Sequence, residues 1–197
     1  MTSPTVRSGT PEDIDAMTAI LTEGFAEDPV IRWLFTTPER YERLAPRLLR
    51  WMVGEAVTAG DAFLVPDKGV LLGRPSTAIE SDAEWAEAED QLRDACGDAA
   101  DNVLEYFRTA RKNHPTGEPH WYGEALAVRP GHRNQNVGTL LIGHCVRTYP
   151  GLPVYGDASS PESARLYVRL GATALGTYRL ADDVELTSVW DVGRLLR

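Results

Sequence analysis

The chain has 197 residues, of which 43% are hydrophobic and 25% are charged, and its formal net charge is -9. This composition is typical of a globular protein and excludes extensive disorder or a fibrous fold. No stretch approaches the roughly 18 apolar residues that a membrane span requires, and the first residues lack a secretory signal, so we expect one cytoplasmic domain over residues 1–197 with no membrane partner.

The first 75 residues predict a short strand, two helical regions and a hairpin. Residues 5–8 are expected to form the strand, and an N-cap followed by proline starts a helix over residues 11–25. Apolar positions at helical spacing predict a second helical region over residues 41–60. Two apolar runs at residues 62–65 and 70–72, separated by a Pro-Asp-Lys-Gly turn, predict the hairpin.

The next segment predicts two acidic helices. Ser81 and Glu84 have the spacing of a capping box, and a further helix is expected over residues 99–111. Residues 80–105 contain ten acidic residues and one arginine, so most of the negative charge is local. Binding to nucleic acid needs clustered lysine and arginine, and we therefore expect no nucleic-acid partner.

The C-terminal half predicts alternating strands and helices. Strands are expected at residues 120–128, 154–158, 174–180 and 184–190, and helices at residues 137–149 and 161–170. Strands separated by helices of this length become parallel neighbours in one sheet. Together with the hairpin, they predict a mixed α/β fold of the α+β kind, in which helices flank a central mixed sheet.

No metal site is predicted. The two cysteines, Cys96 and Cys145, form no metal-binding or disulfide pattern, and the four histidines have no metal-ligand spacing. The sequence also contains no GxSxG elbow and no GxxxxGK[ST] phosphate loop, which disfavours hydrolase and nucleotide triphosphatase functions.

The loop before the helix at Val137 predicts an anion site. The first backbone N–H groups of a helix have no internal partner and lie at the positive end of its dipole. Gly138 lets the backbone approach a ligand closely, and Asn134 and Asn136 are residues that tolerate a positive φ angle. Arg133 adds a full positive charge. A pyrophosphate fits this arrangement, although such a loop is also common as a plain connection.

This region resembles the GNAT superfamily of N-acetyltransferases. The family's cofactor motif, Arg/Gln-x-x-Gly-x-Gly/Ala, aligns with Arg-Asn-Gln-Asn-Val-Gly at residues 133–138. Three further segments are similar to members that act on small molecules: residues 120–122, residues 127–130 and the Leu-Tyr-Val-Arg-Leu-Gly run at 166–171. Because residues 6–7, 12–14 and 26–29 also fit, the resemblance covers almost the whole chain.

The resemblance implies a GNAT fold with a helical insertion at about residues 80–112, and acetyl-CoA or another acyl-CoA as co-substrate. It implies that the backbone of Leu126, Ala127 and Val128 pairs with the pantetheine arm. The pyrophosphate site implied by the motif consists of Arg133, Asn134, Asn136, Val137, Gly138 and Thr139. No metal takes part in the family's reaction, in which an amine attacks the thioester directly within a ternary complex.

Two residues are candidates for proton transfer. The resemblance implies that Tyr167 is the acid that protonates the departing thiolate, although a core aromatic residue would also fit its helix. Glu124 is our candidate base, because a carboxylate in a central strand is unexpected for a purely structural site. Strand alternation predicts that residues 122, 124, 126 and 128 share one face. A salt bridge or an exposed sheet edge remains an alternative for Glu124, and Tyr122 with a water chain remains an alternative base.

The acceptor pocket of the family lies between the first two helices and the late strands. Here it would include Phe25, Asp28, Trp33 and Trp85, each of which could also be a core or capping residue. Asp157 is a further candidate for acceptor binding, and the segment from 157 to 161 also has the composition of a helix cap. Acidic residues near the pocket would suit a cationic amine.

Two departures from the family pattern leave functional alternatives open. Asn136 replaces the first glycine of the motif, and Ala172 stands where phenylalanine is usual. The leading hypothesis is acetyl transfer to a small-molecule amine. The alternatives are a non-catalytic acyl-CoA-binding or regulatory domain and an enzyme that acetylates a protein or peptide amine. The acidic helices could cover the acceptor or form a homodimer surface.

Overall fold

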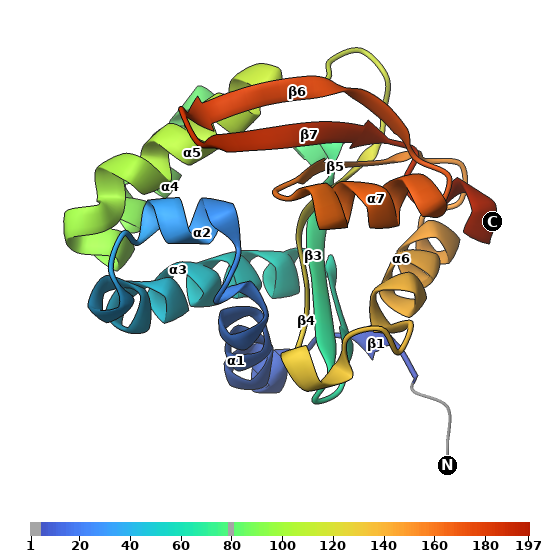
Figure 1. Cartoon of the computed structure of the whole chain (residues 1–197), viewed down its shortest axis with the longest axis horizontal. Helices are drawn as coiled ribbons and strands as arrows, with labels where there is room; N and C mark the ends of the chain where they lie inside the picture. The colour runs from blue at the N-terminus through green and yellow to red at the C-terminus, as the bar shows by residue number, and fades with distance from the viewer. Residues whose placement is uncertain (1–4, 79–80) are drawn as a thin grey trace.

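A computed structural model describes residues 5–78 and 81–197 and has a mixed sheet of seven strands at its centre (Figure 1). The strand order is β1-β2-β3-β4-β5-β7-β6, and β4 and β5 are the parallel pair. The strands are β1 (Arg7–Ser8), β2 (Ala62–Val65), β3 (Gly69–Pro75), β4 (Trp121–Val128), β5 (Val154–Ala158), β6 (Thr173–Ala181) and β7 (Val184–Trp190). The mixed α/β architecture predicted from the sequence is therefore confirmed.

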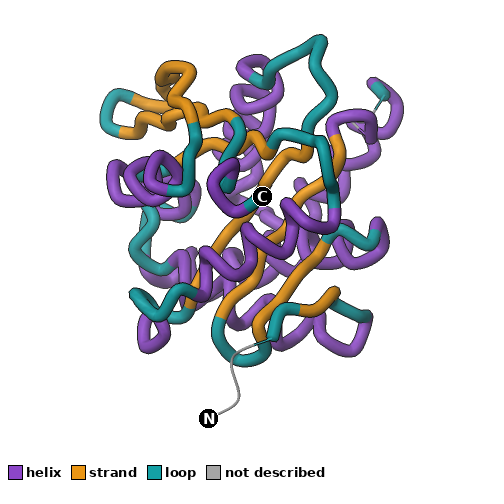
Figure 2. The backbone as a smooth tube through the Cα atoms, turned by 90° about the vertical axis from the view of Figure 1, so that its right-hand side faces the viewer, coloured by secondary structure: helices purple, strands orange, loops and turns teal. Residues whose placement is uncertain are grey.

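Helices cover both faces of the sheet, as the side view shows (Figure 2). They are α1 (Ile14–Phe25), α2 (Pro29–Leu34), α3 (Pro38–Ala59), α4 (Asp82–Cys96), α5 (Ala100–Asn113), α6 (Val137–Thr148) and α7 (Pro161–Arg169). Helices α1 and α3 pack on one face of β2, β3 and β4, and α6 packs on the other face. Helices α4 and α5 lie beside α3, so the acidic segment forms a helical layer next to the sheet.

Helix starts follow the predicted capping chemistry. The Ser81 side chain accepts a hydrogen bond from the Glu84 N–H, and the Glu84 carboxylate binds Ser81 in return, so the predicted capping box opens α4. Thr10 and Asp13 form a similar box before α1. Helix α2 is not among the predicted elements, because Asp28-Pro29 lies between the two expected helical regions and is typical of a break in the chain. The Asp28 carboxylate instead accepts hydrogen bonds from the N–H groups of Val30 and Ile31 and so caps α2.

Strands β4 and β5 separate part of the way along the sheet. Their pairing covers residues 121–123 of β4 and residues 154–156 of β5. Beyond that point β4 continues to Val128 and is paired with β3 alone, while β5 is paired with β7. One backbone edge of β4 is therefore open over its last residues, and the wedge between the two strands is where a ligand can enter the sheet.

A β-bulge at Glu124 interrupts the alternation of side chains that was predicted along β4. Leu72 pairs with Ala125 and Gly73 with Gly123, which leaves Glu124 as the extra residue. Tyr122 consequently faces α3 and α5, whereas residues 126 and 128 pack in the cluster on the α6 side. The prediction that residues 122, 124, 126 and 128 share one face is wrong, because the inserted residue reverses the alternation beyond it.

The two cysteines and the character of the helices bear on two further expectations from the sequence. Cys96 and Cys145 are buried and free, and burial raises the pKa of the Cys96 thiol to about 11. Within residues 5–78 and 81–197, no helix combines the length and apolar character needed to cross a membrane.

Candidate active site

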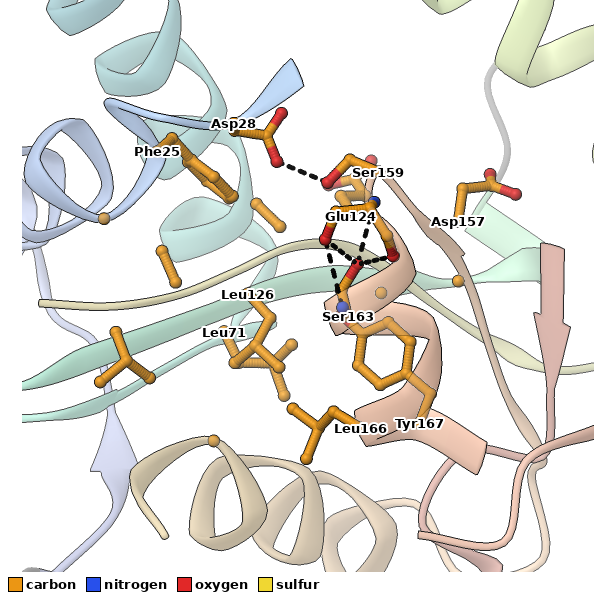
Figure 3. A pocket seen from close by; sticks show the side chains of 18 of the residues that line it. Phe25, Asp28, Leu71, Glu124, Leu126, Asp157, Ser159, Ser163, Leu166 and Tyr167 are labelled. Carbon is orange, nitrogen blue, oxygen red and sulfur yellow. Dashed lines mark hydrogen bonds between the residues drawn. The ribbon is translucent and has the colours of Figure 1, made fainter. Parts of the chain in front are cut away.

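A cavity of about 820 Å³ opens where β4 and β5 separate (Figure 3). Its wall is built by the end of α1, the start of α2, strand β4, the loop before α6 and one side of α7. Segments that are more than 100 residues apart in the sequence therefore meet at one site. We call this space the reaction cavity.

The loop before α6 has the geometry predicted for an anion site. Asn134 and Asn136 each have a φ angle of 61°, in the left-handed region. Over the described part of the chain, the backbone N–H groups of Val137, Gly138 and Thr139 donate no hydrogen bond within the protein, and all three residues line the reaction cavity. These N–H groups stand at the start of a 12-residue helix, where an anion is stabilised.

Gly138 leaves space for a ligand beside this loop. A Cβ atom at Gly138 would lie 3.8 Å from Leu126 and 3.9 Å from Leu166, which are ordinary contact distances. Glycine is therefore not required there by the protein's own packing. The unpaired N–H groups and the open space fit a pyrophosphate, whereas Arg133 donates from Nη2 to the carbonyl oxygen of Gly24 at 2.8 Å and so ties the loop to α1.

The open edge of β4 runs from this loop toward Glu124. Leu126, Ala127 and Val128 line the reaction cavity and pair with β3 on their other side. Peptide-like groups of a ligand can pair with an exposed strand edge as an added strand does. The predicted site for a pantetheine arm is thus accessible in this fold.

Glu124 lies in the bulge and is paired with an arginine. The Nε atom of Arg74 lies 2.7 Å from Oε1 of Glu124, and the two side chains are 22% and 13% exposed. The sequence left a salt bridge open as an alternative for Glu124, and the structure contains it. Glu124 also lines the reaction cavity and a smaller cavity on the other side of the bulge.

Tyr167 extends from α7 and lines the same cavity as Glu124 (Figure 3). Burial, together with the negative charges of Asp28 and Asp157, raises the pKa of the Tyr167 hydroxyl to about 12. The hydroxyl therefore remains protonated at neutral pH and can donate a proton to a basic group that forms beside it.

Asp28 joins the first helices to the end of β5. Its Oδ2 atom accepts a hydrogen bond from the Ser159 hydroxyl at 2.5 Å, while Oδ1 caps α2 (Figure 3). Burial raises the pKa of the Asp28 carboxyl, because the charged form is poorly solvated there. The link to Ser159 was missed, since 131 positions separate the two residues and no sequence pattern connects them.

Asp157 lines the reaction cavity from β5 and does not cap α7. Its Oδ1 atom accepts hydrogen bonds from the hydroxyls of Tyr155 and Ser188, each at 2.8 Å. Burial raises the pKa of the Asp157 carboxyl as well. The cap of α7 is Ser160, whose side chain accepts from the Ser163 N–H.

Of the other three candidates for acceptor binding, Trp85 lines the smaller cavity beyond the bulge. Phe25 lines the reaction cavity at the end of α1. Trp33 lines neither cavity, so its predicted role in acceptor binding finds no place in this geometry. Trp33 instead packs against a buried cluster to which α2, α3, α4, α5 and β7 contribute, and its backbone carbonyl oxygen accepts a hydrogen bond from the Asn102 side chain at 3.1 Å.

Comparisons with known proteins define the class of protein to which this chain belongs. The family model described as "Acetyltransferase (GNAT) family" matches residues 29–172. The chain therefore belongs to the GNAT family of acetyltransferases, which makes it an enzyme of the acyltransferase class. No curated protein sequence matches the chain significantly.

Solved structures with the same fold span nearly the whole chain. A protein from Corynebacterium glutamicum, described as histone acetyltransferase HPA2 and related acetyltransferase, is 27% identical with a TM-score of 0.73, covering 96% of each chain. A polyamine N-acetyltransferase from Drosophila melanogaster is 20% identical with a TM-score of 0.64, covering 94% of this chain and 97% of its own. Arylalkylamine N-acetyltransferase 2 from Aedes aegypti is 12% identical with a TM-score of 0.70, covering 96% and 98%.

The described residues contain no group of three or more His, Cys, Asp or Glu side chains arranged to hold a metal ion. The acidic side chains at the reaction cavity instead make hydrogen bonds and ion pairs with protein groups, as Asp28, Asp157 and Glu124 do.

Proposed function

We propose that this protein transfers the acetyl group of acetyl-CoA to the amine of a small molecule. The observation that carries the proposal is the row of unpaired N–H groups at Val137, Gly138 and Thr139, which faces the same cavity as Glu124 and Tyr167. The family generally uses acetyl-CoA, and two of the similar structures are named as N-acetyltransferases of polyamines and arylalkylamines. These names support a small amine as acceptor.

The co-substrate would lie along the open edge of β4. Residues 133–139 would hold its pyrophosphate, and the backbone of residues 126–128 would pair with the pantetheine arm. This orientation brings the thioester toward the bulge at Glu124 and toward Tyr167 on α7. The loop, the strand edge and the two proton-transfer residues would then contact successive parts of the co-substrate within a single cavity.

The reaction needs two proton movements. The neutral amine nitrogen attacks the thioester carbonyl carbon, so that a C–N bond forms and the C–S bond breaks. We assign Glu124 to accept the proton that leaves the nitrogen, and Tyr167 to donate its hydroxyl proton to the departing sulfur. The products are the N-acetylated amine and the free thiol of coenzyme A, with no covalent enzyme intermediate.

The role of Glu124 is compatible with its ion pair. Arg74 holds the carboxylate at the bulge, between the reaction cavity and the smaller cavity. A carboxylate held there is positioned to receive a proton from an amine that enters from either side. Asp28 and Asp157 would attract the cationic form of the acceptor before it loses its proton.

Two measurements test this function. Calorimetry with acetyl-CoA should show binding to the wild-type protein, and thiol release should then rise on addition of a mixture of small primary amines. Binding without thiol release from any amine would favour the alternative of a non-catalytic acyl-CoA-binding domain. Peptides with a free N-terminus or lysine, if acetylated faster than every small amine, would favour a protein acetyltransferase.

A further inference from the structure

A second cavity lies on the far side of the bulge at Glu124. Its volume is about 160 Å³, and half of its lining residues are aromatic, including Trp51 from α3, Trp85 from α4, Phe107 from α5 and Tyr122 from β4. We call it the aromatic chamber. The helices α4 and α5 that supply much of this wall belong to the acidic insertion, and the proposed coenzyme site does not involve them.

The chamber has the size and lining of a site for one aromatic ring. An apolar cavity of about 150 Å³ in another protein stays dry and binds benzene, which sets the scale for this volume. Phe107 makes an edge contact with Trp51, at a centroid distance of 6.1 Å, and a tilted contact with Trp85, at 6.4 Å, so the wall is already ordered. The guanidinium of Arg111 lies 5.3 Å from the centroid of the Trp85 ring and adds a flat surface.

The chamber and the reaction cavity are adjacent. Four residues line both spaces: Met52, Tyr106, Phe107 and Glu124. Tyr106 at this junction lines the reaction cavity together with the carboxylates of Asp28, Glu124 and Asp157. Burial and these negative charges raise the pKa of its hydroxyl. The junction is therefore a favourable place for an ammonium group, and the chamber next to it is favourable for an apolar ring.

We propose that the aromatic chamber binds the ring of an arylalkylamine acceptor, whose amine lies at the junction with the reaction cavity. This inference rests on the proposed function and narrows its substrate class. A short alkyl linker would join a ring in the chamber to a nitrogen at Glu124. Ala110, which lines the chamber and is 7% exposed, sets the depth available to the ring.

The first test compares three amines with acetyl-CoA: 2-phenylethylamine, n-propylamine and 1,4-diaminobutane. Burial of a phenyl ring is expected to raise kcat/KM for 2-phenylethylamine about 10- to 100-fold above that for n-propylamine. Equal values for these two amines, or a preference for 1,4-diaminobutane, would overturn the inference while leaving the proposed acetyl transfer intact.

The second test fills the chamber. Ala110→Leu should lower kcat/KM for 2-phenylethylamine at least 10-fold and leave the value for n-propylamine nearly unchanged. Ala86→Leu, the same change at an exposed position of α4, should alter neither value. Thermal melting of both variants shows whether they fold. A folded Ala110→Leu protein that loses activity equally with both amines, or with neither, contradicts a ring site.

Calorimetry separates failure of this inference from failure of the proposed function. In the presence of coenzyme A, 2-phenylethylamine should bind the wild type and bind Ala110→Leu at least 10-fold more weakly. If binding follows this pattern but no amine is acetylated, the ring site stands and the proposed activity fails. If the wild type does not bind 2-phenylethylamine, the ring site is refuted whatever the activity toward other amines.

Discussion

Arg74 on β3 holds Glu124 on β4 by an ion pair in which Nε and Oε1 are 2.7 Å apart, at the point where a bulge interrupts the pairing of the two strands. Glu124 is the extra residue of the bulge, and the arginine restrains its side chain. An acid in the middle of a sheet is thereby held in one orientation at the junction of two cavities.

Glu124→Gln should lower kcat about 100-fold or more, because an amide cannot accept the amine proton and general base catalysis typically contributes 10²- to 10⁴-fold. Steady-state thiol release with saturating acetyl-CoA measures the effect. Glu55→Gln, at an exposed position of α3, is the matched control and should retain wild-type activity. A Glu124→Gln enzyme with the wild-type kcat would exclude Glu124 as the base.

Tyr167→Phe should lower kcat about 100-fold with little change in acetyl-CoA affinity, since the ring is retained and only the proton donor is lost. The pKa of Tyr167 is raised to about 12, so its protonated form persists through pH 10. The wild-type rate should accordingly show no decrease between pH 8 and 10 that is caused by ionisation of Tyr167 and is therefore absent from the phenylalanine variant. Such a decrease would contradict the role of Tyr167 as an acid with a raised pKa.

Gly138→Ala should fold normally and bind acetyl-CoA at least 10-fold more weakly. The added Cβ meets protein atoms only at ordinary distances, so lost affinity would come from contact with the ligand. Gly54→Ala in α3, where a Cβ meets nothing within 4 Å, is the matched control. It should raise stability by about 0.5–1 kcal/mol and leave affinity unchanged. Unaltered affinity in Gly138→Ala would argue against a coenzyme at this loop.

Asp28→Asn should raise KM for a cationic amine about 10-fold, because the acceptor loses a carboxylate that attracts it. Asparagine is also a good N-cap, so α2 should persist. Burial raises the pKa of Asp28, so the carboxyl favours folding most when protonated, and this contribution is lost as pH rises through the folded-state pKa. The variant should therefore gain stability relative to wild type between pH 4 and pH 7.5, as urea denaturation would measure.

His114 should make the fold sensitive to moderate acid. Burial, followed by the charge of His120, lowers the pKa of His114 from 6.5 to about 4, and their Nε2 atoms are 2.8 Å apart. The unfolded chain therefore takes up a proton before the folded protein does, and stability falls as pH decreases from 6.5 toward 4. His114→Gln should lose less stability than wild type between pH 7.5 and pH 4.5. Equal losses in urea denaturation would mean that His114 does not cause the acid sensitivity.

The sequence predicted most elements because their signals are local. Helix caps, prolines at helix starts and apolar runs identified α1, α3 to α7 and every strand from β2 to β7 within a few residues. The left-handed conformation of Asn134 and Asn136 was also predictable, since few other non-glycine residues adopt it. The unpaired N–H groups follow from the same local geometry, because any helix that starts after such a loop leaves them free.

The parts that the sequence did not predict depend on contacts between distant segments. The bulge at Glu124 arises from the register between β3 and β4, and neither strand alone indicates it. The hydrogen bond from Ser159 to Asp28 and the ion pair of Arg74 likewise appear only when the strands are assembled. Trp33 was placed wrongly because α2 was not foreseen, and the direction of a six-residue helix decides which way its side chains point.

The two cavities are formed largely by different segments of the chain, which has an evolutionary consequence. Helices α4 and α5 form much of the aromatic chamber, whereas the loop before α6 and the free edge of β4 form the proposed coenzyme site. Substitutions in α4 and α5 can thus diversify the accepted amine while the donor machinery stays constant. Homologues with a different amine selectivity are expected to differ first at these helices. Exchange of the α4–α5 segment between two such homologues should transfer the preference for the acceptor amine.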